Sequence, residues 1–436
     1  MKRVGLISLG CSKNRVDSEV LLGLLAGRGY TIVSDPAQAQ IVIVNTCGFI
    51  EPAKEEAINT LFEMAEYKLG GSLELLIATG CLTQRYGEAL HEGMPEVDAF
   101  LGVSEYERIF EAIDAAYEGK RPLFTGEGKR FLETPRILTT PGYTAYVKIS
   151  DGCDNQCSYC AIPMIRGAYR SRPFDAILAE CRALSEGGAG ELTLIAQDTS
   201  RYGTDFTPGK SQLPELMRAI DSLDSVRWLR VLYCYPDTVD ERLLDALAHL
   251  DNVCPYLDLP LQHISPRILR AMNRRGSPDY IRTLIARCRE LGITLRTTMI
   301  VGFPGETDAE FEELMAFVRE ERFDRLGAFT YSPEEGTPAA ELPDQIAEEV
   351  KQERLDRLMT LQQGISAELM QGRIGEICEV LTEGKADGRY YGRSRLEAPE
   401  IDGKILFAAH GSVEPGTYRN VRITGALAYD LLGEEV

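Results

Sequence analysis

The sequence predicts an α/β protein in three parts: an N-terminal doubly wound parallel-sheet domain, a central (β/α)6 partial TIM barrel and a small C-terminal β-barrel. Three observations predict this. Short apolar segments alternate with amphipathic helical segments as far as residue 340. The chain has 436 residues, which is too long for one ordinary core. Its last segment changes to short strand-like runs separated by glycines.

The N-terminal part, 1–118, contains three apolar strand candidates, "RVGLISLG", "IVIVNT" and "LELLIATG". They are rich in β-branched residues and leucine, as strands covered on both faces should be. Amphipathic helical segments separate them, and this alternation predicts a parallel sheet with helices on both sides. Residues 119–141 mix Gly, Pro and charged residues without a clear period, and we interpret them as a linker.

The central part, 142–370, contains six further strand candidates separated by helical segments, and it closes with a long helix from about Pro343. The six candidates are "TAYVKIS", "ELTLIAQ", "WLRVLYCY", "YLDLPLQ", "LRTTMIVGF" and "RLGAFTYS". Six β/α units in a row favour a barrel, or an incomplete one, over an open sheet. The tail, 371–436, is typical of a small β-barrel.

Composition limits the classes of partner and compartment. The formal net charge is −20, with 67 acidic against 47 basic residues, which disfavours nucleic acid and favours basic partners. No apolar run approaches the roughly 18 residues of a membrane span. Eleven cysteines without a secretion signal indicate metal or redox chemistry in a reducing compartment. We therefore expect a cytoplasmic protein with no membrane contact.

One cysteine motif, "DGCDNQCSYC", directly follows the first strand candidate of the central part, where a β/α barrel carries its active site. Its thiols, Cys153, Cys157 and Cys160, suit an iron–sulfur cluster, which normally takes four. A zinc site would need a fourth ligand, and no His or Cys follows nearby. A two-cysteine redox pair would leave Cys153 without a role. A cluster with one open iron is the favoured interpretation.

The motif CxxxCxxC with Tyr159 before its last cysteine resembles the signature of radical S-adenosylmethionine enzymes. The resemblance implies that Cys153, Cys157 and Cys160 hold a [4Fe-4S] cluster whose fourth iron binds S-adenosylmethionine. It also implies reductive cleavage of that cofactor to a 5′-deoxyadenosyl radical, in a barrel that excludes water.

A second set of cysteines is dispersed in the N-terminal part. Cys11, Cys47 and Cys81 each lie at or just past the carboxyl end of a predicted strand. Ligands bind at that edge of open α/β sheets, so folding should bring the three thiols together. A single cysteine there is often a small buried hydrophobe, but three equivalent positions favour a second cluster.

The three parts together, over essentially the whole chain, resemble the methylthiotransferase family. The resemblance implies that Cys11, Cys47 and Cys81 hold a second [4Fe-4S] cluster, on whose open iron the sulfur to be inserted is delivered. It implies that the tail is a TRAM domain that recognises substrate. It also implies an electron donor such as flavodoxin or ferredoxin.

Other candidate residues are less specific. We expect the remaining cysteines to be buried free thiols. His263 ends a barrel strand and either lines the pocket or is a hydrogen-bonded structural residue. The turn with Gly302, Gly305 and Glu306 resembles a family segment near S-adenosylmethionine, although a Gly-Pro-Gly sequence is first of all a turn. Gln197 and the adjacent Asp198 also follow a strand, and Gln197 is a candidate cofactor contact together with Tyr159.

The family has two branches, one acting on an adenosine of transfer RNA and the other on the β-carbon of an aspartate in ribosomal protein S twelve of the small subunit. The stretches "ISDGCDNQCSYCAIPMIRGAYRSR" and "GRSRLEAPEIDG" resemble the ribosomal-protein branch. The tail carries more acidic than basic residues, and Glu397, Glu400 and Asp402 would suit a basic protein. We expect no direct nucleic-acid binding. A transfer RNA enzyme and a non-enzymatic iron–sulfur redox protein remain the alternatives.

Overall fold

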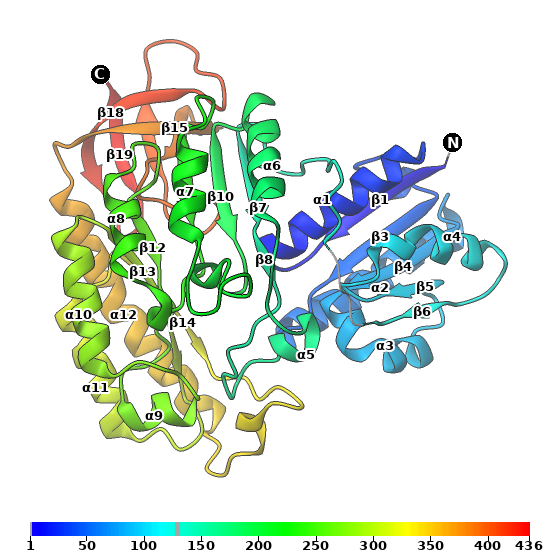
Figure 1. Ribbon diagram of the computed structural model, residues 1–436, viewed down its shortest axis with the longest axis horizontal. Helices are drawn as coiled ribbons and strands as arrows, with labels where there is room; N and C mark the ends of the chain where they lie inside the picture. Colours follow the sequence, from blue (N-terminus) through cyan, green and yellow to red (C-terminus); the bar gives the residue numbers. More distant parts are fainter. Residues whose placement is uncertain (1, 127–130) are drawn as a thin grey trace.

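The computed structural model describes residues 2–126 and 131–436, and it has the three parts expected from the sequence (Figure 1). The N-terminal domain, the central barrel and the C-terminal barrel follow one another from blue to red. None of the helices in the described ranges is long and apolar enough to cross a membrane.

The N-terminal domain is a parallel sheet of six strands in the order β2-β1-β3-β4-β5-β6. The alternation of side chains along β3 explains its two helical layers: Val42 and Val44 pack in one cluster with α2 and α3, whereas Ile41 and Ile43 pack with α1 and α4. This confirms the doubly wound arrangement. The elements are β1 (Arg3–Ser8), α1 (Ser12–Gly27), β2 (Thr31–Ile32), η1 (Pro36–Gln38), β3 (Ile41–Thr46), α2 (Glu51–Gly70), β4 (Leu75–Gly80), α3 (Cys81–Gly93), β5 (Ala99–Leu101), η2 (Tyr106–Arg108), α4 (Ile109–Tyr117) and β6 (Leu123–Phe124).

Strand β6 falls inside 119–141, the segment interpreted as a linker. It pairs with β5, with Leu123 opposite Phe100, so the start of that segment extends the N-terminal sheet. Residues 127–130 of the same segment lie outside the described residues. The part around Pro135 runs over α1, where the Ile137 N–H donates to the Glu19 carbonyl.

The central domain is an incomplete barrel of six parallel strands in two runs, β7-β10-β11 and β12-β13-β14, joined by a bridge between Leu229 and Val253. Helices α6, α7, α8, α10 and α11 pack on its outside, and α12 packs against β14. The elements are β7 (Thr144–Lys148), β8 (Ser150–Asp151), α5 (Ile162–Arg166), β9 (Arg170–Ser171), α6 (Phe174–Glu186), β10 (Glu191–Ile195), η3 (Thr199–Arg201), α7 (Leu213–Asp221), β11 (Trp228–Val231), η4 (Pro236–Thr238), α8 (Glu241–His249), β12 (Tyr256–Asp258), α9 (Pro266–Ala271), α10 (Pro278–Glu290), β13 (Thr294–Val301), α11 (Asp308–Glu321), β14 (Arg325–Thr330), η5 (Pro338–Glu341) and α12 (Glu348–Gly372).

The C-terminal domain is a closed barrel in the order β15-β16-β17-β19-β18. Its strands are β15 (Ile377–Ala386), β16 (Arg389–Arg393), β17 (Ile405–Ala408), β18 (Tyr418–Ala426) and β19 (Leu431–Glu435). It docks on the central barrel through a fully buried ion pair, in which Arg393 Nη2 lies 2.7 Å from Glu191 Oε2. The partly buried Tyr418 also packs edge-on against Trp228.

Two of the three carboxylates in the acidic loop, residues 397–402, have buried side chains, so the expectation that Glu397 and Asp402 offer charge to a basic partner is wrong. Arg325 and Arg373 bind the Glu397 carboxylate at 3.0 and 2.7 Å. The Tyr256 hydroxyl donates to Asp402 at 2.7 Å. The loop therefore neutralises arginines that the central barrel buries. Glu400 is half-exposed, and it pairs with Arg15 of α1.

This docking gives a stability prediction. Glu397→Lys should lower the free energy of unfolding by about 3–5 kcal/mol, because it removes the partner of two buried guanidinium groups and adds a third cation beside them. Denaturant unfolding measures the loss. Glu414→Lys makes the same charge change at an exposed site of the same domain and should cost less than about 1 kcal/mol. Equal losses for the two variants would contradict the docking role.

Candidate active site

The three dispersed cysteines of the N-terminal domain meet at one sheet edge. Cys11, Cys47 and Cys81 follow β1, β3 and β4, which are adjacent parallel strands. The turn before Cys11 packs tightly on Cys47: Gly10 has a φ of +85°, and a Cβ atom there would lie 3.0 Å from Cys47 Sγ. Only glycine meets both requirements without strain. We call these three residues the N-terminal triad.

Burial raises the pKa of two thiols of this triad. It raises the pKa of Cys81 to about 12 and also raises that of Cys47, and in each the neighbouring thiols of the triad add to the effect. Such thiols stay protonated at neutral pH unless a cation compensates the thiolate charge. Binding of a metal would displace these protons, as metal binding to cysteine does in general.

The cysteines of the central domain form a second group, which we call the barrel triad: Cys153, Cys157 and Cys160. They lie in the loop that follows β8, and the loop is closed by hydrogen bonds from the Cys160 N–H to the Cys157 carbonyl and from the Cys153 N–H to the Gly167 carbonyl, both 3.1 Å. Burial raises the pKa of Cys153 to about 11 and that of Cys160 to about 12, with neighbouring thiols contributing.

The donor sets fit iron–sulfur clusters better than single metal ions. Within residues 2–126 and 131–436, no three His, Cys, Asp or Glu side chains are placed to hold one ion. In a cubane each thiolate binds a different iron, so the sulfurs surround the cluster instead of converging on one point. Each triad supplies three thiols, which would leave one iron open.

One arginine connects the two triads. Arg166 ends α5, six residues after Cys160, and its Nη2 atom lies 3.5 Å from Cys81 Sγ. The same nitrogen donates to Asn14 Oδ1 at 2.7 Å, and Asn14 in turn donates to the carbonyls of Leu9 and Thr46 beside the N-terminal triad. The loop of the barrel triad is thereby tied to the N-terminal triad. Sequence reasoning missed Arg166 and Asn14, although both lie within a few residues of candidate cysteines.

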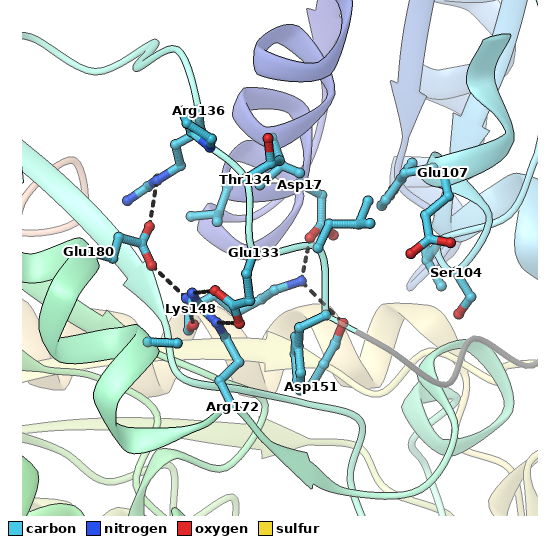
Figure 2. A pocket seen from close by; sticks show the side chains of 18 of the residues that line it. Asp17, Ser104, Glu107, Glu133, Thr134, Arg136, Lys148, Asp151, Arg172 and Glu180 are labelled. Carbon is cyan, nitrogen blue, oxygen red and sulfur yellow. Dashed lines mark hydrogen bonds and ion pairs between the residues drawn. The ribbon is translucent and has the colours of Figure 1, made fainter. Parts of the chain in front are cut away.

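A buried charge network supports Arg166, and it lines a cavity of about 860 Å³ between the domains (Figure 2). Arg166 Nη1 binds Asp17 of α1 at 2.9 Å and Asp151 at 3.2 Å. Lys148 binds both of these carboxylates, and Arg172 binds Glu133 and Glu180. The labelled cations in Figure 2, Arg136, Lys148 and Arg172, thus each pair with carboxylates. No cysteine is among the lining residues, so we assign this cavity to the domain interface.

The network predicts the effect of losing Arg166. Arg166→Met should lower the free energy of unfolding by about 3–5 kcal/mol, because Asp17 and Asp151 would then share only Lys148. Arg287→Met removes an exposed arginine with two surface carboxylate partners and should cost less than about 1 kcal/mol. Thermal or denaturant unfolding of the apo-proteins compares the two. A cost for Arg166→Met no larger than that control would contradict the role of the network.

Tyr159 lies at the barrel triad. Its ring packs with a buried apolar cluster that includes Phe303 and Tyr331, and Arg274 donates to its hydroxyl at 3.3 Å. The same guanidinium lies 3.9 Å from Cys157 Sγ, as does the Tyr235 hydroxyl. Arg274 and Tyr235 were not singled out from the sequence, because they lie far from the motif along the chain.

The turn after β13 is held mainly by its own contacts. Gly302 has a φ of +72°, and a Cβ atom there would lie 2.3 Å from Lys351 of α12. Its N–H donates to the Glu306 carboxylate, which also binds Arg354 of α12 at 3.3 Å. His263 accepts a hydrogen bond from the Ser265 N–H at 2.9 Å, and its other ring nitrogen lies 3.5 Å from Glu306. The hydrogen bond from Ser265 favours the structural alternative for His263, while its Nε2 has no hydrogen-bond partner among the described residues.

Two polar residues follow β10 at the carboxyl edge of the barrel. The Gln197 amide oxygen is buried, and no described residue donates to it, so it is available to a bound group. Burial raises the pKa of Asp198 to about 6, against the opposing hydrogen bonds from Ser200 and Asn155. Asn155 lies within the motif of the barrel triad, which places Asp198 beside that loop.

Comparison with known proteins matches this geometry to families. Residues 3–102 match the model described as "Uncharacterized protein family UPF0004", residues 147–318 match the radical SAM superfamily, and residues 374–436 match the TRAM domain. A protein of Desulforamulus reducens named ribosomal protein uS12 methylthiotransferase RimO is 50% identical, over 100% of this chain and 99% of that protein. The protein of the same name from Clostridium acetobutylicum is 47% identical, over 99% and 97%.

The chain belongs to the uS12 methylthiotransferase family. It is an enzyme, a methylthiotransferase, and its cofactors are S-adenosylmethionine and [4Fe-4S] clusters. These expectations from the sequence are confirmed.

Solved structures support the fold of this family member at low sequence identity. The radical S-adenosylmethionine methyltransferase TsrM from Kitasatospora setae, with cobalamin and a [4Fe-4S] cluster bound, is 15% identical with a TM-score of 0.58, over 89% of this chain and 80% of that one. The cobalamin-dependent enzyme OxsB has a TM-score of 0.52 at 12% identity, over 84% and 56%. At these identities the likeness concerns the fold alone.

Proposed function

We propose that this protein transfers a methylthio group to the β-carbon of an aspartate in ribosomal protein uS12. The observation that carries the proposal is the pair of three-thiol sites joined through Arg166, one in each domain. A sulfur-carrying site and a radical-forming site must act on the same carbon. Arg166, which contacts both domains, holds the two sites close to each other. The relatives named above support the choice of uS12 over transfer RNA.

Each triad has a separate role in this proposal. Cys153, Cys157 and Cys160 hold the cluster that binds S-adenosylmethionine, and Cys11, Cys47 and Cys81 hold the cluster at which sulfur is delivered. When bound, the first cluster supplies one electron for cleavage of the sulfonium to a 5′-deoxyadenosyl radical. Gln197, Gly302 and Tyr159 border the cofactor, whereas Glu306 positions the turn that carries Gly302.

Residues around the two triads place positive charge beside the thiols and exclude water. The Arg274 guanidinium places a positive charge 3.9 Å from Cys157 Sγ. Arg166 does the same for Cys81 at 3.5 Å. Aromatic side chains of the barrel strands, including Tyr146 and Tyr256, pack with Val16 of α1 in a buried cluster. Packing that excludes water protects a carbon radical from side reactions.

The net charge of −20 suits a basic ribosomal protein as partner. The proposal also requires a one-electron donor, such as flavodoxin or ferredoxin, and it places the reaction in the cytoplasm with the ribosomal subunit.

Mass spectrometry of uS12 from cells lacking this gene tests the proposal. The expected result is loss of a methylthio group from one aspartate, restored by the wild-type gene but not by a variant with Cys153, Cys157 and Cys160 changed to Ala. An unchanged uS12 mass in the deletion strain would contradict the proposal.

A further inference from the structure

Lys13 is a buried cation without an anionic partner. Three lysines of the described residues are buried: Lys13, Lys148 and Lys351. Lys148 binds Asp17 and Asp151, and Lys351 binds Glu348 and the Tyr331 carbonyl. Lys13, only 7% exposed, has no carboxylate or hydrogen-bond acceptor among the described residues; its ammonium lies over the Tyr233 ring, 2.8 Å from the centroid. A buried charge normally has a partner, so this one is placed to receive an anion.

The ring beneath this ammonium is held in place by a strained backbone. Tyr233 follows β11 and has a φ of +65°, a left-handed conformation that non-glycine residues rarely adopt. Its N–H donates to Asp258 at 2.9 Å, and its carbonyl accepts from the Thr199 N–H at 2.9 Å. Its ring packs with the aromatic cluster of the barrel interior. Such strain persists where surrounding contacts fix it, and it is concentrated at functional sites.

The pair lies between the two triads. Lys13 is two residues after Cys11, in the first turn of α1. Tyr233 is two residues before Tyr235, whose hydroxyl lies 3.9 Å from Cys157 Sγ. The pair therefore connects the segment that carries Cys11 with the segment whose Tyr235 hydroxyl lies beside Cys157. A substrate carbon must lie in that region if both triads act on it.

We propose that the Lys13 ammonium, positioned by Tyr233, binds the side-chain carboxylate of the substrate aspartate. This inference rests on the proposed function. The carboxyl carbon is bonded directly to the β-carbon, so anchoring the carboxylate fixes the position of the reacting atom. An ion pair with this largely buried lysine also selects aspartate over asparagine, which has nearly the same shape but no charge.

The test measures this selectivity with reconstituted holoenzyme, purified uS12 and a uS12 variant whose target aspartate is asparagine. Wild-type enzyme should bind the aspartate form about 10- to 100-fold more tightly, the range for a charge-assisted hydrogen bond. Lys13→Met should reduce that ratio to near unity, and Lys13→Arg should retain most of it. A structural defect in the variant would weaken both forms equally and leave the ratio unchanged.

Lys2→Met is the matched control, because Lys2 also lies over a tyrosine ring, that of Tyr117, but is partly exposed and paired with Glu74. It should keep the wild-type ratio. Iron content and the visible spectrum should be unchanged in Lys13→Met, because no cluster ligand is altered.

If Lys13→Met binds the aspartate form as selectively as wild-type enzyme, the inference is overturned. If the cluster spectrum of that variant also changes, Lys13 serves the cluster on Cys11 instead. Wild-type enzyme that methylthiolates uS12 but shows no aspartate preference would overturn the inference alone. Wild-type enzyme that does not modify uS12 would overturn the proposed function, and this inference with it.

Discussion

Replacing Cys11, Cys47 and Cys81 with Ala is expected to abolish methylthio transfer and to leave cleavage of S-adenosylmethionine intact. The barrel triad is positioned by its own domain: Ser158 binds the backbone of Ala271 and Met272, and the Ala339 N–H donates to the Ser158 carbonyl. It does not need the N-terminal thiols for its geometry. Product formation on uS12 and release of 5′-deoxyadenosine, measured on the same reconstituted sample, check both halves of the prediction.

Cys378→Ala provides the control for this variant, because Cys378 is a partly exposed free thiol of the C-terminal barrel. It should retain both activities. Methylthiolated product from the N-terminal triple variant would contradict the division of labour between the triads.

Changing Cys153, Cys157 and Cys160 together to Ala should have the opposite pattern. The protein should lose about half of its iron, because one of two four-iron clusters can no longer assemble. Both 5′-deoxyadenosine and methylthiolated uS12 should be absent, since no radical forms. Iron analysis after anaerobic reconstitution and chromatography of the reaction products measure these outcomes. Full iron content in this variant would show that the cluster ligands have been misassigned.

The features that depend on local pattern could be predicted from the sequence. The CxxxCxxC motif identified the barrel triad directly. The N-terminal triad followed from one topological rule, because adjacent parallel strands place their carboxyl ends at one edge, and Cys11, Cys47 and Cys81 follow β1, β3 and β4.

Features that depend on the docking of domains could not be predicted in this way. Glu397 looked like a surface carboxylate because its partners, Arg325 and Arg373, are distant in sequence and buried. Arg166 and Lys13 were overlooked because an isolated cation in a helical turn carries no signal of its environment. The environments of these two residues arise where α1 and α5 pack at the contact between the N-terminal and central domains. Hydrophobic periodicity within the chain does not predict that contact.

The central claim is best tested by one competition reaction. Reconstituted enzyme, S-adenosylmethionine and a reductant are incubated with equal amounts of uS12 and transfer RNA, and both are analysed by mass spectrometry. The account predicts a methylthio group on a single aspartate of uS12 and none on any adenosine. A methylthio group on adenosine with unmodified uS12 would contradict it.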